Sequence, residues 1–356
     1  MITIDKQALL ELAEAGRTIG ADDLFVAVED GGYSAVLTTK DNKMVAFKNK
    51  PACLKANWSR IDFPFISKAA SKPSVISVDI NDSSATAVFE GSKAKTAVVA
   101  HGVIPDFGFD QFASLTYNKA PVVSTRSLMQ GVLTDTSKPD DILLNVHLTD
   151  QFAEVTNRKV MLRTSFEKQE GVGETVMSPE LAKTILSGLS YAVLSLPDKR
   201  TGNVNPVAIA VKLDSGWNCL FSQQQKQYPA LGGIYNQWML RPAEATVYVE
   251  SVLKLLNDLV IDPTRVIFKT GKAVFQSDKS EDIQECTFNI DIADKEFAFG
   301  VDYLDVFLKH CVCCKETTFA LMESAPDKDG VTSVAAFFNS PTGIGLMSGL
   351  RLIAKK

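Results

Sequence analysis

The chain has 356 residues and a mass of 38.7 kDa. It is long enough for two or three domains, because single hydrophobic cores rarely grow past roughly 250–300 residues. Apolar residues make up 46% and charged residues 22%, which excludes a disordered or fibrous chain. The net charge of −5 argues against a surface that coats nucleic acid throughout, although it leaves room for a local basic face.

Two further sequence features indicate a cytoplasmic protein without disulfides. No stretch approaches the roughly 18 uninterrupted apolar residues of a membrane span, and the first 16 residues include Asp5, Lys6, Glu11 and Glu14, where a signal peptide would have its apolar segment. The six cysteines lack the spacing of a disulfide scaffold, so we expect free thiols.

One structural unit repeats along the chain. An extended segment, an amphipathic helix and two or three β-rich segments can be read about six times, and pairs of these units give thirds of about 119 residues. The expected domains are residues 1–118, 119–240 and 241–356.

Patterning predicts the following elements in chain order. In the first third they are strands at 1–4, 24–28, 34–39 and 44–48, and helices at 6–17 and 63–70. In the middle third they are helices at 125–133 and 180–194, and strands at 121–124, 142–147, 152–156, 160–166, 174–177, 207–213 and 217–223. In the last third they are helices at 249–260 and 301–311, and strands at 245–247, 265–270, 272–277, 285–292, 295–300, 317–323, 333–339 and 345–352.

The fold class is therefore α+β, with three tandem domains that each contain two strand-helix-strands units. Each helix must cover a twisted antiparallel sheet, so two units together bury a core that neither could bury alone. An arc of three such domains, with sheets outside and helices inside, closes into a ring if two copies meet head to tail.

The carboxyl end of the sequence resembles a known family. Residues 296–311 (EFAFGVDYLDVFLKHC), followed by TTFALMES, SVAAFF and the terminal GLMSGLRL, look like the last half-domain of bacterial DNA polymerase III β subunits, the sliding clamps. The resemblance covers the whole chain in layout and the final third in sequence detail. It implies a non-catalytic processivity factor, in which a homodimeric ring encircles duplex DNA and tethers a DNA polymerase after a clamp loader has closed it.

The resemblance also implies a pocket for partner peptides between the second and third domains. Matching positions assign to it Leu144, Thr156, Arg158, Lys159, Val160, Met161, Pro229, Ile234, Gly300, Tyr303, Val331, Ser333, Met347, Ser348, Gly349, Leu350, Arg351 and Leu352. Two stretches depart from the family pattern. The turn at 157–160 reads Asn-Arg-Lys-Val in place of Asp-Gly-His-Arg, and Gly232 and Gly233 replace paired arginines. Such drift suggests a divergent clamp from a phage or a mobile element, which would act in the host cytoplasm.

The sequence also predicts residues that contact DNA and residues at the contact between the two subunits. The cations expected to face DNA lie on or just after the helices, and they are Arg126, Lys183, Lys199, Arg200, Lys254 and Lys309. They would contact phosphates without reading bases. The seam between subunits is expected at Leu259 and Val260.

The sequence predicts no cofactor, metal or catalytic site. The cluster His310-Cys311-Val312-Cys313-Cys314 lacks a second ligand pair for zinc, and buried thiols at a helix end explain it as well. There is no phosphate-loop, G-x-G-x-x-G, G-x-S-x-G or H-E-x-x-H pattern. Two alternatives remain open: a soluble multidomain α+β enzyme with an unrecognised site, and a clamp-fold binding protein that does not encircle DNA.

Overall fold

The computed structural model describes residues 1–29, 31–55, 57–101, 103–113, 115–132, 141–169, 174–197, 204–222, 228–293, 295–326 and 332–350. Its contacts divide the chain into two compact units. Unit 1 contains Met1–Ala120 and Ser187–Gln225, and unit 2 contains Pro121–Gln169, Glu174–Leu186 and Lys226–Lys356. The expected middle domain therefore contributes strands to both units, and the division into three domains drawn from the sequence stays a prediction.

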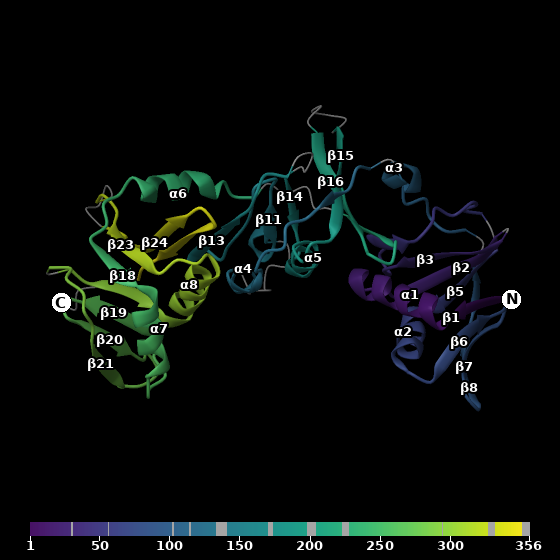
Figure 1. The fold of residues 1–356 in the computed structure, drawn as a ribbon, viewed down its shortest axis with the longest axis horizontal. Helices are drawn as coiled ribbons and strands as arrows, with labels where there is room; N and C mark the ends of the chain where they lie inside the picture. Colours follow the sequence, from purple (N-terminus) through teal and green to yellow (C-terminus); the bar gives the residue numbers. More distant parts are fainter. Residues whose placement is uncertain are drawn as a thin grey trace. The chain divides into compact units, whose positions relative to one another are not determined.

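In unit 1 the described residues form two antiparallel sheets and three helices (Figure 1). The helices are α1 (Lys6–Ile19), α2 (Phe63–Ser71) and α3 (Phe109–Ala113). The four-stranded sheet has the order β1 (Ile2–Asp5), β6 (Val75–Ile80), β7 (Ser84–Phe89) and β8 (Ser92–Ala97). The nine-stranded sheet has the order β10 (Asn118–Lys119), β15 (Ser190–Pro197), β16 (Val204–Lys212), β17 (Asn218–Ser222), β4 (Met44–Phe47), β3 (Gly32–Thr38), β2 (Asp23–Glu29), β5 (Trp58–Asp62) and β9 (Val99–His101).

Helix α1 forms where the sequence predicted it. The Asp5 carboxylate accepts the Ala8 N–H at 2.8 Å and caps the first turn. Gly20, with φ 64°, ends the helix in the left-handed conformation that glycine adopts readily. Gly16 allows α2 to approach, since a Cβ there would lie 2.2 Å from the Phe63 ring. Figure 1 shows the two helices side by side.

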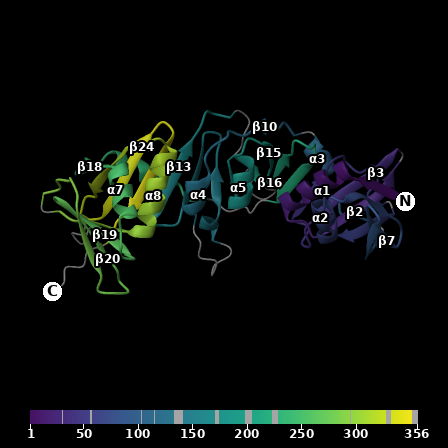
Figure 2. The same ribbon diagram turned by 60° about the horizontal axis from the view of Figure 1, so that its bottom comes forward.

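Unit 2 also contains two antiparallel sheets (Figure 2). The eight-stranded sheet has the order β14 (Thr175–Met177), β11 (Val146–Leu148), β12 (Phe152–Thr156), β13 (Val160–Ser165), β25 (Gly343–Ser348), β24 (Val334–Ser340), β23 (Thr318–Glu323) and β18 (Ala245–Tyr248). The four-stranded sheet has the order β21 (Ile283–Thr287), β20 (Lys272–Gln276), β19 (Arg265–Lys269) and β22 (Phe297–Gly300). The helices are α4 (Arg126–Gln130), α5 (Pro179–Ile185), α6 (Leu231–Met239), α7 (Val249–Asn257), α8 (Val301–Cys313) and the 3-10 turn η1 (Ile142–Leu144).

Opposite faces of the eight-stranded sheet carry different helices. Helix α8 packs against β13 and β25 and contacts α4 and α7, while α6 packs against the other face. We call these the α8 face and the α6 face. Among the described residues, no helix combines the length and apolar character that a membrane span requires.

A buried histidine joins α4, α8 and the two strands β13 and β25. His310 Nδ1 accepts the Ser127 hydroxyl at 3.0 Å, and Nε2 donates to the carbonyl oxygens of Arg163 at 3.0 Å and Ile344 at 3.2 Å. Burial lowers the pKa of His310 to about 4, so the ring is neutral at pH 7. All six cysteines are free thiols in the structure, as the sequence predicted.

Two predictions for the middle third were wrong. The helix expected at 180–194 ends at Ile185, and Tyr191–Leu194 belong to strand β15, because Gly188 with φ 98° redirects the chain and Tyr191 and Ala192 are buried in the sheet. The strand expected at 142–147 begins with the turn η1 and becomes β11 only at Val146. Helix α6 was not predicted at all.

Candidate partner-binding surface

Strands β13 and β25 bring together residues that are almost 190 positions apart. Val160 pairs with Met347 and Met161 with Leu346, while the Lys159 carbonyl accepts the Ser348 N–H at 2.8 Å. The two sequence segments expected to line the partner pocket are therefore neighbours in one sheet.

Residues on the α6 face form cross-strand rows, because paired residues of an antiparallel sheet point to the same side. The charged row contains His147, Glu154 and Arg163, followed by Ile344. The apolar row contains Met161, Leu346, Phe337 and Ala320. The third row, which we call the lip row, begins at the turn before β13 and contains Lys159, Ser348, Ala335 and Met322.

Helix α6 packs across these rows. Leu231 and Tyr235 are buried against Leu346 and Phe337, and Ile234 and Trp238 are half-buried beside them. We define the α6 patch as four of the half-buried apolar residues of this cluster, the ones on or beside α6, β13 and β25, which are Met161, Ile234, Trp238 and Ile344. Met161 and Ile234 were expected in the pocket, whereas Leu346, Tyr235 and Trp238 were missed.

Several expected pocket residues lie away from the α6 patch. Val160 and Met347 are fully buried on the α8 face and act as core residues. Leu350 packs on Ile267, Val274 and Ala298 of the four-stranded sheet. Leu144 ends the turn η1, in which Leu143 and Ile142 are the residues that reach the α6 cluster.

The remaining positions expected in the pocket lie at the start of α8, just before α6, just before β24 and just after β25. Gly300 and Tyr303 lie at the start of α8, with a Cβ at 300 reaching 3.0 Å from the Tyr303 ring. Gly349 donates to the Val334 carbonyl, and a Cβ there would lie 2.1 Å from Val334. Pro229 is exposed just before α6, and Ser333 precedes β24. Val331, Arg351 and Leu352 lie outside the described residues.

Side chains fix the turn between β12 and β13. Thr156 Oγ1 donates to the Val160 carbonyl at 2.9 Å and accepts the Arg158 N–H at 3.1 Å. Asn157 Oδ1 accepts the N–H groups of Lys159 and Val160. Arg158 adopts a positive φ of 74° and pairs with Asp141 at 2.8 Å. The turn thereby fixes two exposed cations, Lys159 within the lip row and Arg158 next to it.

The charged row forms a hydrogen-bonded network beneath α6. Glu154, 2% exposed, accepts Arg163 Nε and Nη2 at 2.9 and 2.7 Å, and its other oxygen lies 2.8 Å from His147 Nδ1. His147 Nε2 lies 2.8 Å from the Glu174 carboxylate, and its ring stacks on Tyr228 at 5.0 Å. The Arg163 guanidinium lies over Phe152 and Tyr235 at 3.8 and 4.9 Å. Sequence reasoning missed this network, because each residue comes from a different strand.

Burial around this network also acts on two tyrosines. It raises the pKa of Tyr228 and of Tyr235 well above the ordinary value, so both hydroxyls stay neutral. The Tyr228 hydroxyl accepts the Thr156 N–H at 3.1 Å, which ties the start of α6 to β12. The Tyr235 hydroxyl is buried and has no hydrogen-bond partner within the described part of the chain.

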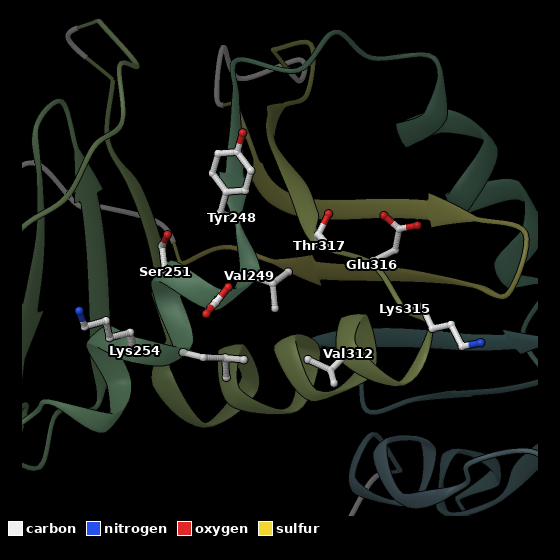
Figure 3. A pocket seen from close by; sticks show the side chains of 10 residues that line it. Tyr248, Val249, Ser251, Lys254, Val312, Lys315, Glu316 and Thr317 are labelled. Atoms are coloured by element: carbon white, nitrogen blue, oxygen red, sulfur yellow. The ribbon is translucent and has the colours of Figure 1, made fainter.

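The cations assigned to DNA differ in their surroundings. Arg126 on α4, Lys183 on α5 and Lys254 on α7 are exposed, while Lys309 on α8 is half-buried in an ion pair with Asp305. Lys199 and Arg200 lie outside the described residues. A groove of about 670 Å³ separates the start of α7 from the end of α8, and Lys254 and Lys315 line it together with Tyr248 and Val312 (Figure 3). Glu250 and Glu316 also line the groove, so its charge is mixed.

The predicted seam lies beside a free sheet edge. Leu259 and Val260 follow α7, and Val260 is 89% exposed. The Val260 N–H donates to Gln284 of β21 at 3.0 Å, and β21 is the outermost strand of its sheet. Among the residues that the structure describes, β21 is paired with β20 alone, so the seam residues are attached to an open sheet edge.

No metal site emerges from the part of the chain that the structure describes. It contains no group of three or more His, Cys, Asp or Glu side chains arranged to hold a metal ion. Cys311 on α8 and Cys314 just after it are buried, and burial raises the pKa of the Cys314 thiol to about 12.

Solved sliding-clamp structures resemble this chain over nearly its entire length. A putative DNA polymerase III β subunit from Eubacterium rectale is 9% identical, with a TM-score of 0.68 over 99% of each chain. The Helicobacter pylori β clamp bound to a DNA ligase peptide is 13% identical, with a TM-score of 0.66 over 98% of this chain and 99% of that chain. A Pseudomonas aeruginosa sliding clamp bound to griselimycin is 12% identical, with a TM-score of 0.66 over 99% of each chain. No protein-family model and no curated protein matches the sequence. The chain therefore has the fold of the bacterial DNA polymerase III β subunits, the sliding clamps.

Proposed function

We propose that this protein is a sliding clamp: a homodimeric ring that encircles duplex DNA, is closed by a clamp loader and tethers a DNA polymerase without catalysing a reaction. The observation that carries the proposal is the match to sliding clamps over 98–99% of the chain. It would act in the cytoplasm, or in the host cytoplasm if the source is viral.

Two free sheet edges support head-to-tail pairing between copies. Strand β8 ends the four-stranded sheet of unit 1, and β21 ends that of unit 2. Edge strands present unpaired N–H and C=O groups that another strand can complete. The exposed side chains of β8 include Lys93 and Lys95, whereas β21 carries Glu285 and follows Glu281 and Asp282. Glu285 also pairs with Lys272 of β20 at 3.0 Å, so part of its charge is balanced within the chain. The exposed acids and lysines still give the two edges charges of opposite sign, which favours pairing with each other over pairing with themselves.

Exchange of these charges tests the dimer. Lys95→Glu should shift the protein from dimer to monomer in sedimentation, Glu285→Lys should do the same, and the two variants mixed should form a heterodimer. Lys55→Glu, which changes an exposed cation elsewhere in unit 1, is the matched control. Unchanged mass in both edge variants would place the subunit contact elsewhere.

DNA binding in this proposal depends on phosphate contacts. Arg126, Lys183, Lys254 and Lys309, with Lys199 and Arg200 from the sequence, would contact the backbone loosely, and the groove adds Lys315. Such contacts carry no base readout and weaken as salt is added, which permits sliding.

Partner docking in this proposal centres on the α6 patch. The Helicobacter pylori clamp bound to a DNA ligase peptide shows that one protein of this fold holds a partner peptide. Here a polymerase or loader segment would bury its apolar side chains on Met161, Ile234 and Trp238. Griselimycin, with which the Pseudomonas clamp was solved, serves as a probe. Met161→Glu should abolish its binding, and Val122→Glu, at a position that is 79% exposed outside the patch, should leave it intact.

Negative-stain electron microscopy tests the proposal as a whole. Closed rings built from two chains, with a hole that admits duplex DNA, would establish it. Particles without a hole that still bind griselimycin through the α6 patch would support a clamp-fold binding protein that does not encircle DNA. Particles without a hole and without this binding would favour the unrecognised enzyme.

A further inference from the structure

The groove between the start of α7 and the end of α8 has the size of a small-ligand site. Its volume of about 670 Å³ lies within the range of roughly 300–1,000 Å³ that such sites have. Val249, Leu253 and Val312 give it apolar walls. A second hollow of about 340 Å³ lies between α7 and residues 287–289, and Tyr248 and Lys254 line both hollows. These two side chains are therefore accessible from both.

Tyr248 presents an uncovered aromatic ring at this groove. The residue is 66% exposed, and among the described residues its ring stacks on no other aromatic side chain. Its backbone is fixed, because Tyr248 pairs with Thr318 of β23 and the next N–H, that of Val249, donates to the Thr317 carbonyl at 2.9 Å. A rigidly held, exposed ring of this kind can stack on a nucleobase.

Two lysines lie at opposite ends of the groove. Figure 3 shows Lys254 at one end and Lys315 at the other, with Tyr248 between them. Both lysines are exposed, and neither forms an ion pair with another residue that the structure describes. Lys315 follows α8 with a φ of 57°, at a position where glycine is usual. The groove therefore has an uncompensated cation at each end, which suits the successive phosphates of one extended strand.

A carboxylate lies between these cations. Glu316 is half-buried, and in Figure 3 it lies between Tyr248 and Lys315. Its N–H donates to the Cys311 carbonyl at 2.8 Å, and within the described part of the chain its carboxylate forms no ion pair. A carboxylate repels phosphate but accepts hydrogen bonds from the amino groups of cytosine, adenine and guanine. Glu316 thus favours a base, and not a phosphate, in the middle of the groove.

We propose that this groove binds an unpaired nucleotide of single-stranded DNA, with the base on Tyr248, its amino group on Glu316 and the neighbouring phosphates on Lys254 and Lys315. The inference rests on the proposed role at DNA and adds a site that recognises a single strand. In a duplex the faces of each base are covered by its neighbours, so only an unpaired base can stack on Tyr248. Thymine is the least suitable base, because it has no amino group.

Fluorescence anisotropy with labelled single strands of about ten nucleotides tests the site. At low salt oligo(dC) should bind about fivefold tighter than oligo(dT), which is the discrimination that one base contact provides. Tyr248→Leu should weaken oligo(dC) binding about five- to tenfold through the loss of stacking, whereas Tyr248→Phe keeps the ring and should bind as the wild type does. A duplex of the same length should not distinguish Tyr248→Leu from the wild type.

Further variants separate the base contact from the phosphate contacts. Glu316→Ala should bring the affinities for oligo(dC) and oligo(dT) together. Lys254→Gln and Lys315→Gln should weaken the binding of both strands, and each should lower the slope of log affinity against log salt by about 0.7. Lys55→Gln, an exposed cation of unit 1, is the matched control and should change neither quantity.

The outcomes distinguish this site from the proposed ring. Unchanged single-strand binding in Tyr248→Leu, or equal binding of oligo(dC) and oligo(dT) by the wild-type protein, would overturn the site and leave the ring and its duplex contacts standing. Particles without a hole in electron microscopy, together with single-strand binding that depends on Tyr248, would overturn the ring and leave the nucleotide site standing.

Discussion

In each unit a strand of the expected middle domain pairs with a strand of a neighbouring expected domain, and we call each such place a sheet junction. The two junctions have similar strand pairing but different side chains beneath the covering helix. In unit 1 strand β17 pairs with β4, and in unit 2 β13 pairs with β25. Each junction joins strands of the expected middle domain to a neighbour, and each is covered by a helix, α3 in unit 1 and α6 in unit 2.

The unit 1 junction is apolar throughout its core cluster. Phe109 and Phe112 of α3 pack with Phe47, Trp58 and Leu220, and the rings of Phe47 and Phe109 meet edge to face at 4.8 Å. The unit 2 junction places Glu154, His147 and Arg163 beneath its covering helix. Apolar side chains beneath a helix need only pack closely, whereas each buried charge needs a partner of opposite charge. The second junction is thus the costlier arrangement, and it is the one that carries the candidate partner surface.

Loss of charge at the unit 2 junction should have one of the two largest effects. Glu154→Gln keeps the shape but leaves Arg163 without its anionic partner, so the free energy of unfolding should fall by about 3–5 kcal/mol. Urea unfolding monitored through Trp238, which packs in this cluster, measures it. Glu167→Gln, at an exposed position, is the control, and an equally small loss in both variants would show that the network contributes little.

A comparable loss should follow from a cavity at the unit 1 junction. Phe109→Ala removes a ring that is 1% exposed, at a cost of about 3–5 kcal/mol. Trp58 lies in the same cluster and reports the change in a background in which both Trp217 and Trp238 are replaced by Phe. Griselimycin binding should be unaffected, and its loss would show that the two units are energetically coupled. Val103→Ala, at an exposed site, is the control.

The neutral His310 makes unit 2 sensitive to acid. Burial lowers its pKa from 6.5 to about 4 in the folded state, so the unfolded chain binds the proton more tightly. The stabilisation is complete above pH 6.5 and is lost as the pH falls towards 4, by about 3 kcal/mol. Unfolding at a series of pH values should show a smaller decline in His310→Gln than in the wild-type protein. Parallel pH profiles would rule out this role.

The smallest effect concerns the start of α1 in unit 1. Asp5→Ala removes the carboxylate that accepts the Ala8 N–H and should cost about 1 kcal/mol. Asp5→Asn retains a capping oxygen and should restore most of the loss. Thermal unfolding compares the three proteins. Equal destabilisation by alanine and asparagine would mean that charge, and not the hydrogen bond, stabilises this helix end.

Local patterns predicted those elements whose periodicity is strong. The stripes of α1 and α8 and the hairpin of β19 and β20 at Gly271 formed where expected. The helix expected at 249–260 begins as expected but ends at Asn257, and Val260 is 89% exposed beyond it. Helix α6 was missed because Gly232 and Gly233 carry low helix propensity, and its apolar face is stabilised only by packing on β25 and β24. The strand β15 was misread because 180–194 is apolar at helical spacing, although its second half completes a sheet.

The residues of the candidate partner surface likewise fall into those that the sequence predicted and those that only the structure revealed. The carboxyl-terminal segment by itself indicated the sliding-clamp fold, and Met161 and Ile234 were predicted from the positions that correspond in the family's middle domain. Only the tertiary structure showed that Val160 and Met347 face the other side, since a one-residue change of register exchanges the two faces of a strand. The charged row of His147, Glu154 and Arg163 likewise depends on three strands meeting in register, and no local pattern in a sequence specifies such a long-range alignment.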